Sequence, residues 1–187
     1  MEKDTRIYLE SNPNPNSLKF VVNYLLVPEG MIFDYPDAES ARRSPLALEL
    51  FKLEYVNRVF IMNNFVTITK DGTKEWSEIQ DSLKERILNF LDQENPVVQI
   101  PEAGEEDEGT TEIEMRVRSL LDEYVKPAVE QDGGAIQFYS YNDGVVKVLL
   151  QGACSGCPSS TITLKNGIEN LLRSMIPEVK AVEAEGI

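Results

Sequence analysis

Histidine is absent from the 187 residues of this chain, and only two cysteines are present. A metal site made by one copy would have no imidazole ligands. It would also have only half of the four thiolates that a tetrahedral zinc site or an iron–sulfur cluster requires. Two cysteines are too few for a secreted fold held by disulfides, and closely spaced pairs in cytosolic proteins more often bind metal or exchange electrons.

Positive charge is scarce as well. Lys and Arg number 18 against 32 Asp and Glu, which gives a net charge of −14. Nucleic acids and anionic membrane surfaces both require clustered positive charge, so neither is expected as a partner. The hydrophobic fraction of 42% and the charged fraction of 27% are typical of a folded, soluble protein.

Long hydrophobic runs are also missing, since none approaches the roughly 20 residues of a membrane-spanning helix. The N-terminal stretch MEKDTRIYLE has neither the apolar core of a signal peptide nor the Arg- and Ser-rich character of a transit peptide. These features favour a cytoplasmic protein, with a bacterial-type cytosol as the first choice. A processed organellar protein would have the same appearance.

An acidic segment divides the chain. Residues 93–112, QENPVVQIPEAGEEDEGTTE, combine Pro, Gly and many acids with no basic residue. Adjacent like charges repel and there is little apolar surface to bury, so we expect a flexible or extended linker. It separates a first domain, residues 1–92, from a second, residues 113–187. The predicted fold class is α+β, with two small domains that each pack a short sheet with helices.

The first domain alternates strand and helix patterns. Asn and Pro in the turn SNPNPNS disfavour helix between strands 6–10 and 18–23. Ser44-Pro45 opens a helix that carries Leu46 and Leu50 on one side. Strands 56–62 and 65–69 are joined by Asn63-Asn64, a pair suited to a tight hairpin. Apolar residues at helical spacing complete the domain: Trp76, Ile79, Leu83, Ile87 and Phe90.

The second domain begins at Thr111-x-x-Glu114, which fits a capping box. The apolar pattern after it predicts a helix over 113–128, which Pro127 should kink or tighten. Asp132-Gly133-Gly134 should end this helix. Five further features follow in order: strand 135–141, the hairpin turn Asn142-Asp143-Gly144, strand 145–150, a helix from about Pro158 to Ile176, and strand 179–184.

Both cysteines lie in the stretch QGACSGCPSSTITLKNG, between a strand and a helix, as Cys154 and Cys157. Gly152 and Gly156 allow a sharp turn and are expected to leave both sulfurs uncovered. Pro158 suits the first position of the helix. Cys157 would then sit beside the free N–H groups of a helix N-terminus, which favour thiolate over thiol.

Four uses of such a pair are possible: a redox dithiol, a zinc site shared by two chains, a 4Fe–4S cluster shared by two chains, or two small core residues. A Gly-rich turn disfavours core packing. Thioredoxin-like proteins also place CxxC between a strand and a helix. Against the redox reading, the strands here are linked as a hairpin rather than in a βαβ unit, and Pro follows the motif. The spacing alone does not separate zinc from iron–sulfur.

Longer stretches resemble a known family. DGVVKVLLQGACSGCPSSTITLKNGIENLL, with EQDGGAIQF before it, is similar to the C-terminal NifU-like domain of Nfu-type iron–sulfur cluster scaffold and carrier proteins. NPNPNSLKF and SPLALELFKLEYVNRVFIMNNFVTITK resemble the N-terminal domain of that family. The resemblance covers most of the chain outside the acidic segment.

The resemblance implies a carrier rather than an enzyme, with Cys154 and Cys157 as the cluster ligands and no catalytic residue. Its cargo would be a 4Fe–4S cluster, with 2Fe–2S as the second form. The cluster would bridge a homodimer or higher homo-oligomer, arrive from an upstream cluster donor and pass to apo iron–sulfur proteins. The first domain would help to recognise those partners.

Overall fold

The computed structural model describes residues 4–100, 111–155 and 158–186, with the backbone alone for 158–160. The chain divides into two compact units, Met1–Glu102 and Ala103–Ile187. Among the described residues, no helix has both the length and the apolar character needed to cross a membrane.

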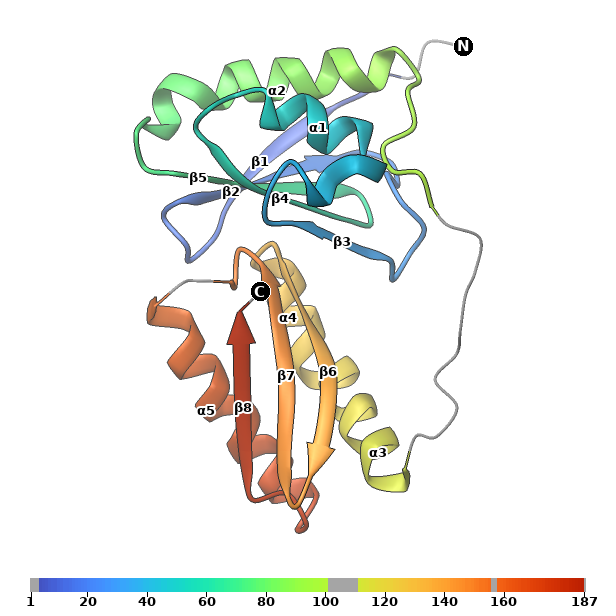
Figure 1. Ribbon diagram of the computed structural model, residues 1–187, viewed down its shortest axis with the longest axis vertical. Helices are drawn as coiled ribbons and strands as arrows, with labels where there is room; N and C mark the ends of the chain where they lie inside the picture. The colour runs from blue at the N-terminus through green and yellow to red at the C-terminus, as the bar shows by residue number, and fades with distance from the viewer. Residues whose placement is uncertain (1–3, 101–110, 156–157, 187) are drawn as a thin grey trace. The chain divides into compact units, whose positions relative to one another are not determined.

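The first unit is a two-layer α+β structure (Figure 1), as the sequence predicts. Its sheet is antiparallel, with strand order β1-β2-β5-β4-β3. Helices α1 and α2 cover one face of that sheet (Figure 1). Its elements are β1 (Ile7–Ser11), β2 (Ser17–Val22), β3 (Ile32–Tyr35), η1 (Ser40–Arg43), α1 (Pro45–Phe51), β4 (Val56–Met62), β5 (Phe65–Lys70) and α2 (Trp76–Asp92).

Local chemistry explains where these elements start and turn. Ser44 caps α1, because its Oγ accepts the Ala47 N–H at 3.1 Å. Asn63 adopts φ 47° in the β4–β5 turn, a left-handed conformation that asparagine tolerates. The predicted strands and both predicted helices are confirmed. The short strand β3 and the 3₁₀ turn η1 were not predicted, since neither has a clear periodic pattern of hydrophobic residues.

The start of the predicted linker packs on the first unit. Val98 is 9% exposed and belongs to that unit's hydrophobic core. The Ser44 hydroxyl donates to Val97 O at 2.8 Å, and Gln99 N–H donates to Arg43 O at 2.7 Å. The packing of the first unit therefore continues past the predicted boundary at residue 92, because two valines there bury apolar surface. Residues 101–110 of the predicted linker lie outside the described residues.

The second unit places its helices on one face of a three-stranded sheet, β6-β7-β8 (Figure 1). Its core joins sheet residues such as Val148 and Leu150 to helix residues such as Val117, Ile168 and Leu172. Its elements are α3 (Glu112–Leu120), η2 (Leu121–Val125), α4 (Lys126–Gln131), β6 (Gly134–Asn142), β7 (Val145–Gly152), α5 (Pro158–Met175) and β8 (Ala181–Gly186).

The helix over 112–131 is interrupted where the sequence predicts a kink or a tightening, and the tightening was wrong. Its turn at Leu121–Val125 widens into a π-helix rather than tightening, and Lys126 N–H donates to Leu121 O, five residues back. Pro127 has no N–H to give and its ring crowds the preceding turn. The wider turn places Pro127 in the first turn of α4, where a missing N–H costs little.

The two ends of the unit follow from turn geometry. Asp143 and Gly144 have φ of 50° and 87°, so a two-residue turn with both residues left-handed joins β6 to β7.

β7 then pairs with β8 in parallel, with α5 as the crossover between them. The second unit therefore contains a βαβ unit, and the expectation that it holds only hairpin-linked strands was wrong. The error arose because a parallel pairing partner follows only from the tertiary structure.

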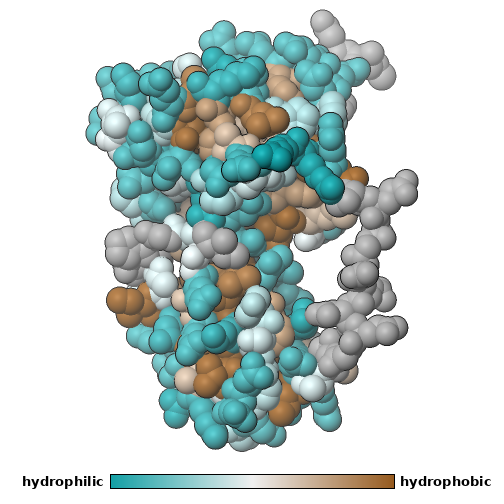
Figure 2. Space-filling view, in the orientation of Figure 1, coloured by the Kyte–Doolittle hydropathy of each residue, from teal (hydrophilic) through white to brown (hydrophobic). Residues whose placement is uncertain are grey.

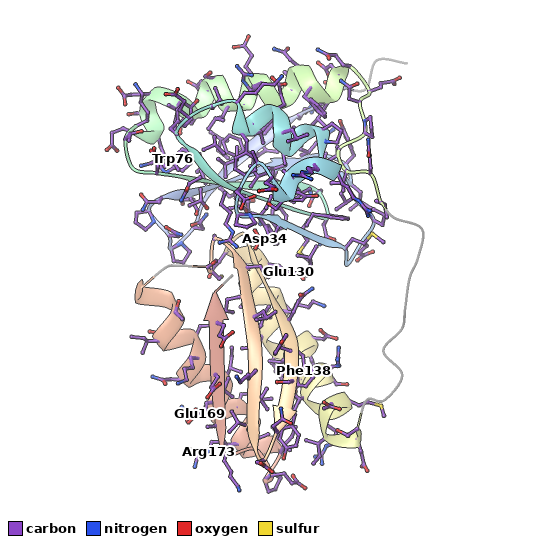
Figure 3. All side chains as sticks on the ribbon, viewed as in Figure 1. Asp34, Trp76, Glu130, Phe138, Glu169 and Arg173 are labelled. Carbon is purple, nitrogen blue, oxygen red and sulfur yellow. The ribbon has the colours of Figure 1, made fainter. Side chains whose placement is uncertain are left out.

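α5 also protects the edge of the sheet. The Glu169 carboxylate accepts the N–H of Val182 on β8 at 3.0 Å, and Arg173 pairs with Glu169 at 3.6 Å (Figure 3). An unpaired strand edge would otherwise offer its N–H groups to another chain. The Glu169 carboxylate accepts a hydrogen bond from one of those N–H groups, that of Val182.

Thr111 caps α3 and forms a capping box with Glu114. Thr111 N–H and its hydroxyl both donate to the Glu114 carboxylate, at 2.7 and 2.9 Å, and these bonds lower the pKa of Glu114. Thr111→Ala is expected to reduce the free energy of unfolding of the second unit by about 1 kcal/mol at neutral pH. A carboxyl whose pKa is lowered by folding stabilises the folded state at pH values above its pKa in the unfolded chain, near 4.3. That stabilisation is lost as the pH falls through the lower pKa of the folded state.

The difference between wild type and Thr111→Ala should therefore shrink as the pH falls below about 4. Urea unfolding at neutral and acidic pH measures it. Glu114→Gln is the control, because its side chain can still accept the bonds without titrating. Equal differences at both pH values would contradict this account.

Candidate metal centre

The site forms where β7 ends. Gly152, the last residue of β7, has φ 67°, a left-handed conformation that glycine adopts without strain. Ser155 N–H then donates to Gly152 O at 3.1 Å, and Ala153 N–H donates to Gly133 O at 3.3 Å. These bonds fasten the turn that carries Cys154 to the segment between α4 and β6.

Cys154 is buried rather than uncovered. Its residue is 6% exposed and belongs to the hydrophobic core of the second unit. The prediction that the flanking glycines leave this sulfur uncovered was therefore wrong. Gly152 shapes the turn, whereas the surroundings of the sulfur depend on another glycine, distant in sequence.

That glycine is Gly134, the first residue of β6, which pairs with Gly152. A Cβ added to Gly134 would lie 2.8 Å from Cys154 Sγ and 2.7 Å from Gln151 O. No real Cβ comes so close to these atoms without displacing them. The absence of a side chain at position 134 therefore provides the space in which the Cys154 thiol lies.

From the sequence, Gly134 is predicted only as part of the stop of the preceding helix. Gly133 alone serves that purpose, since it has φ 80° at the helix end and Gly134 is not left-handed. The signal that could have revealed its second role was the presence of two adjacent glycines where one is sufficient.

Cys157, the second predicted ligand, lies outside the described residues, as does Gly156. The structure therefore does not test whether the two sulfurs lie together. α5 begins at Pro158, directly after Cys157 in sequence, as predicted.

The described residues offer no complete set of metal ligands. In these parts of the chain, no group of three or more His, Cys, Asp or Glu side chains comes together. The chemistry of the donor set fits a thiolate-bound metal or cluster, because the sequence supplies two cysteines in CxxC spacing. One copy supplies half of the ligands that such a group requires.

The geometry changes the case for a redox dithiol. The CxxC does lie between a strand and the crossover helix of a βαβ unit, so topology no longer counts against that reading. Reactive cysteines, however, are partly exposed, whereas Cys154 is 6% exposed. In the single chain, burial limits access to this thiol for a disulfide substrate and for a cluster shared with a second chain alike, so it does not separate the two uses.

Two small α+β units, one of which has the sequence CxxC directly before a helix, define a class of two-domain α+β proteins. Comparison with known proteins gives the family. The family model described as "Scaffold protein Nfu/NifU N terminal" matches residues 7–94, and the model described as "NifU-like domain" matches residues 117–183. Together they match most of the chain. The chain belongs to the Nfu family, with the N-terminal domain of that family followed by a NifU-like domain.

Curated relatives agree with this assignment. The chain is 41% identical over 180 residues to a Drosophila persimilis protein and 42% identical over 180 residues to one from Drosophila grimshawi. Both are named "NFU1 iron-sulfur cluster scaffold homolog, mitochondrial". The matches cover 95% of this chain but only 64% and 60% of those two proteins. The chain therefore spans less than two thirds of the length of these relatives.

Among solved structures, a NifU-like protein from Saccharomyces cerevisiae is 24% identical to this chain, with a TM-score of 0.42. The match covers 52% of this chain and 87% of that chain. At this TM-score the likeness adds nothing to the family assignment.

Proposed function

We propose that this protein carries an iron–sulfur cluster as cargo. Two copies bind one 4Fe–4S cluster between them through Cys154 and Cys157 of each, with 2Fe–2S as the second form. The protein receives the cluster from an upstream donor and passes it to apo iron–sulfur proteins. It acts as a carrier and not as an enzyme.

The observation that carries this proposal is the combination of family and donor count. The chain belongs to a family whose curated members are named iron–sulfur cluster scaffolds. It has two cysteines and no histidine, so a four-thiolate cluster needs a second copy. A cluster shared at the junction of two copies is held by fewer ligands per chain, which makes its release easier.

Transfer follows from thiolate exchange. A thiolate of the recipient replaces Cys154 or Cys157 at one iron, and the displaced sulfur takes up a proton. Four such exchanges move the cluster without any net oxidation or reduction. The affinity of either protein for the cluster depends on deprotonated sulfur.

We propose that the first domain, residues 1–92, binds recipients while the acidic linker, residues 93–112, tethers it to the cluster domain, residues 113–187. Because residues 97–99 pack on the first unit, the tether is shorter than the predicted linker. A short tether keeps a bound recipient at high effective concentration near the cluster.

Anaerobic reconstitution with iron and sulfide tests the proposed function. The full chain is expected to bind about two irons per copy, as one 4Fe–4S cluster per dimer. Cys154→Ala and Cys157→Ala should each reduce bound iron to near background, because each removes two of the four thiolates of the dimer. Iron and sulfide analysis, visible absorption and sedimentation provide the measurements.

Other outcomes would favour the alternatives. Stoichiometric zinc after aerobic purification, without visible absorption, would support a zinc-bridged dimer. Turnover in a disulfide-reduction assay, lost in either Cys→Ser variant, would support a redox dithiol. Cluster loading that is indifferent to Cys154→Ala would reject the proposed ligands.

For the compartment we retain the cytosol, with an organellar form as the alternative that the relatives' mitochondrial names indicate. Fractionation of cells that express the tagged full chain tests this choice. Recovery of the chain in the mitochondrial fraction would reject a cytosolic location.

A further inference from the structure

A cavity of about 410 Å³ lies between α1 and α2 in the first unit. The two helices lie side by side on one face of the sheet (Figure 1), and Arg86 Nη1 on α2 donates to Glu49 Oε1 on α1 at 2.6 Å. The volume is in the range of pockets that bind small ligands or short peptide segments. This α1–α2 groove is lined by Glu49 of α1 and by α2 residues that include Ser82, Glu85, Arg86, Asn89 and Phe90.

One side of α2 presents a row of polar groups to the α1–α2 groove. Ser82, Arg86, Asn89 and Gln93 follow one another at intervals of four, three and four residues, so they lie within about 60° of one another around the helix. Figure 2 shows mainly hydrophilic residues along α2, so this surface is not an apolar patch. Side-chain amides both donate and accept hydrogen bonds, as peptide groups do. The row is therefore suited to bind peptide backbone.

Arg86 adds a group that can bind a carboxylate. Among the described residues only Glu49 pairs with it, through Nη1, and the other oxygen of Glu49 pairs with Lys52 at 2.5 Å. Nε and Nη2 of Arg86 are left, on a side chain that is 36% exposed. These two nitrogens form one side of the planar guanidinium, which matches the two oxygens of a carboxylate.

The length and charge of the groove fit an extended peptide. The row from Ser82 to Gln93 runs about 16 Å along the helix. An extended chain advances about 3.3 Å per residue, so about five residues cover it. Glu85 also lines the groove, and in the described parts of the chain no cation pairs with its carboxylate. A segment with an acidic residue for Arg86 and a basic residue for Glu85 therefore matches both properties.

We propose that the α1–α2 groove binds an extended segment of the apo recipient, about five residues long. An acidic side chain of that segment pairs with Arg86, a basic one pairs with Glu85, and the amides of Asn89 and Gln93 bind its backbone. The inference rests on the proposed function, in which the first domain binds recipients, and it assigns that binding to a site and a chemical class of partner.

Cluster transfer from the anaerobically loaded full chain to the apo form of a 4Fe–4S dehydratase tests the groove. Arg86→Gln should raise the recipient concentration at half-maximal rate about tenfold or more, because it removes a charge-assisted bond. The maximal rate should not change, since this bond is present before and during transfer. Iron analysis should show unchanged loading.

Two further variants separate binding from a structural role. Arg86→Lys keeps the ion pair with Glu49 but lacks the planar fork, so it should still raise that concentration at least about threefold. Lys84→Gln removes a half-buried cation of α2 that does not line the groove, and it should change the value less than about twofold. Circular dichroism checks the fold of each variant.

A photoreactive side chain identifies the occupant. With Asn89→p-benzoylphenylalanine, irradiation in the presence of the recipient should crosslink an internal segment of the recipient that contains both an acidic and a basic residue. Mass spectrometry of the crosslinked peptide measures this. A C-terminal peptide of the recipient, a peptide from a second copy of the carrier, or no crosslink would each overturn the proposed occupant.

The outcomes separate the two proposals. If wild type loads and transfers a cluster, and both Arg86 variants behave like Lys84→Gln, the proposed function stands and the α1–α2 groove is wrong as the docking site. If wild type neither loads nor transfers a cluster, both proposals are wrong.

Discussion

Replacing Gly134 with alanine is expected to reduce cluster loading at least about fivefold while the second unit remains folded. The new Cβ would lie 2.8 Å from Cys154 Sγ and 2.7 Å from Gln151 O. The Cys154 side chain can rotate, so the sulfur moves away from the position in which the turn holds it, and the β6–β7 pairing must also shift because Gln151 O belongs to the backbone. Anaerobic reconstitution followed by iron analysis, with the visible circular dichroism of the cluster, measures the effect.

Two controls separate the position of the sulfur from general destabilisation. Gly167→Ala adds the same methyl group where nothing lies within 4 Å, and it should leave the fold intact or more stable. A double-mutant cycle then compares Gly134→Ala in wild type and in Cys154→Ala. Part of the destabilisation should disappear when Sγ is absent, with a coupling energy of about 0.5–3 kcal/mol. If Gly134→Ala lowers the free energy of unfolding equally in wild type and in Cys154→Ala, and Gly134→Ala still loads iron fully, the role given to Gly134 is contradicted.

Leu172→Ala is expected to have the largest effect on stability. Leu172 is fully buried in the core of the second unit, and Leu→Ala at such sites costs about 2–5 kcal/mol. In calorimetry of the full chain, the unfolding temperature of the second unit should fall by roughly 4–8 °C for each kcal/mol of stability lost, while that of the first unit is unchanged.

Leu83→Ala is the matched control, because Leu83 is equally buried in the core of the first unit. Leu83→Ala should lower the unfolding temperature of the first unit and leave that of the second unit unchanged, so that cluster loading is retained. A single transition that both variants lower together would contradict two independently stable domains.

The predicted elements succeeded where the local signal was strong. The Thr111–Glu114 capping box, the Asn63 hairpin and the Asp143-Gly144 turn all form as the sequence predicts, because each depends on neighbours within four residues. The strand β3 was missed because four residues without alternation leave no period to detect. An interruption before Pro127 was predicted in the right position, but its tightening was wrong, since both a tighter and a wider turn accommodate a missing N–H.

The candidate site was less predictable than the fold. The two cysteines are evident from the sequence, and their spacing and place before a helix are local facts. The burial of Cys154 was predicted wrongly, because it depends on Gly134, twenty residues earlier, and on the pairing of Gly134 with Gly152. No local pattern records which residue lies across a sheet from a thiol.

By itself, the sequence determined the class of this protein: two α+β domains, an acidic segment between them, and two cysteines, too few to complete a metal site in one copy. These properties depend on composition, spacing and short-range turns. Only the tertiary structure decided that β8 runs parallel to β7, that α5 is the crossover between them, and that a missing side chain at Gly134 makes room for the Cys154 sulfur. Each of these depends on contacts between residues far apart along the chain, which close packing selects and local propensity does not encode.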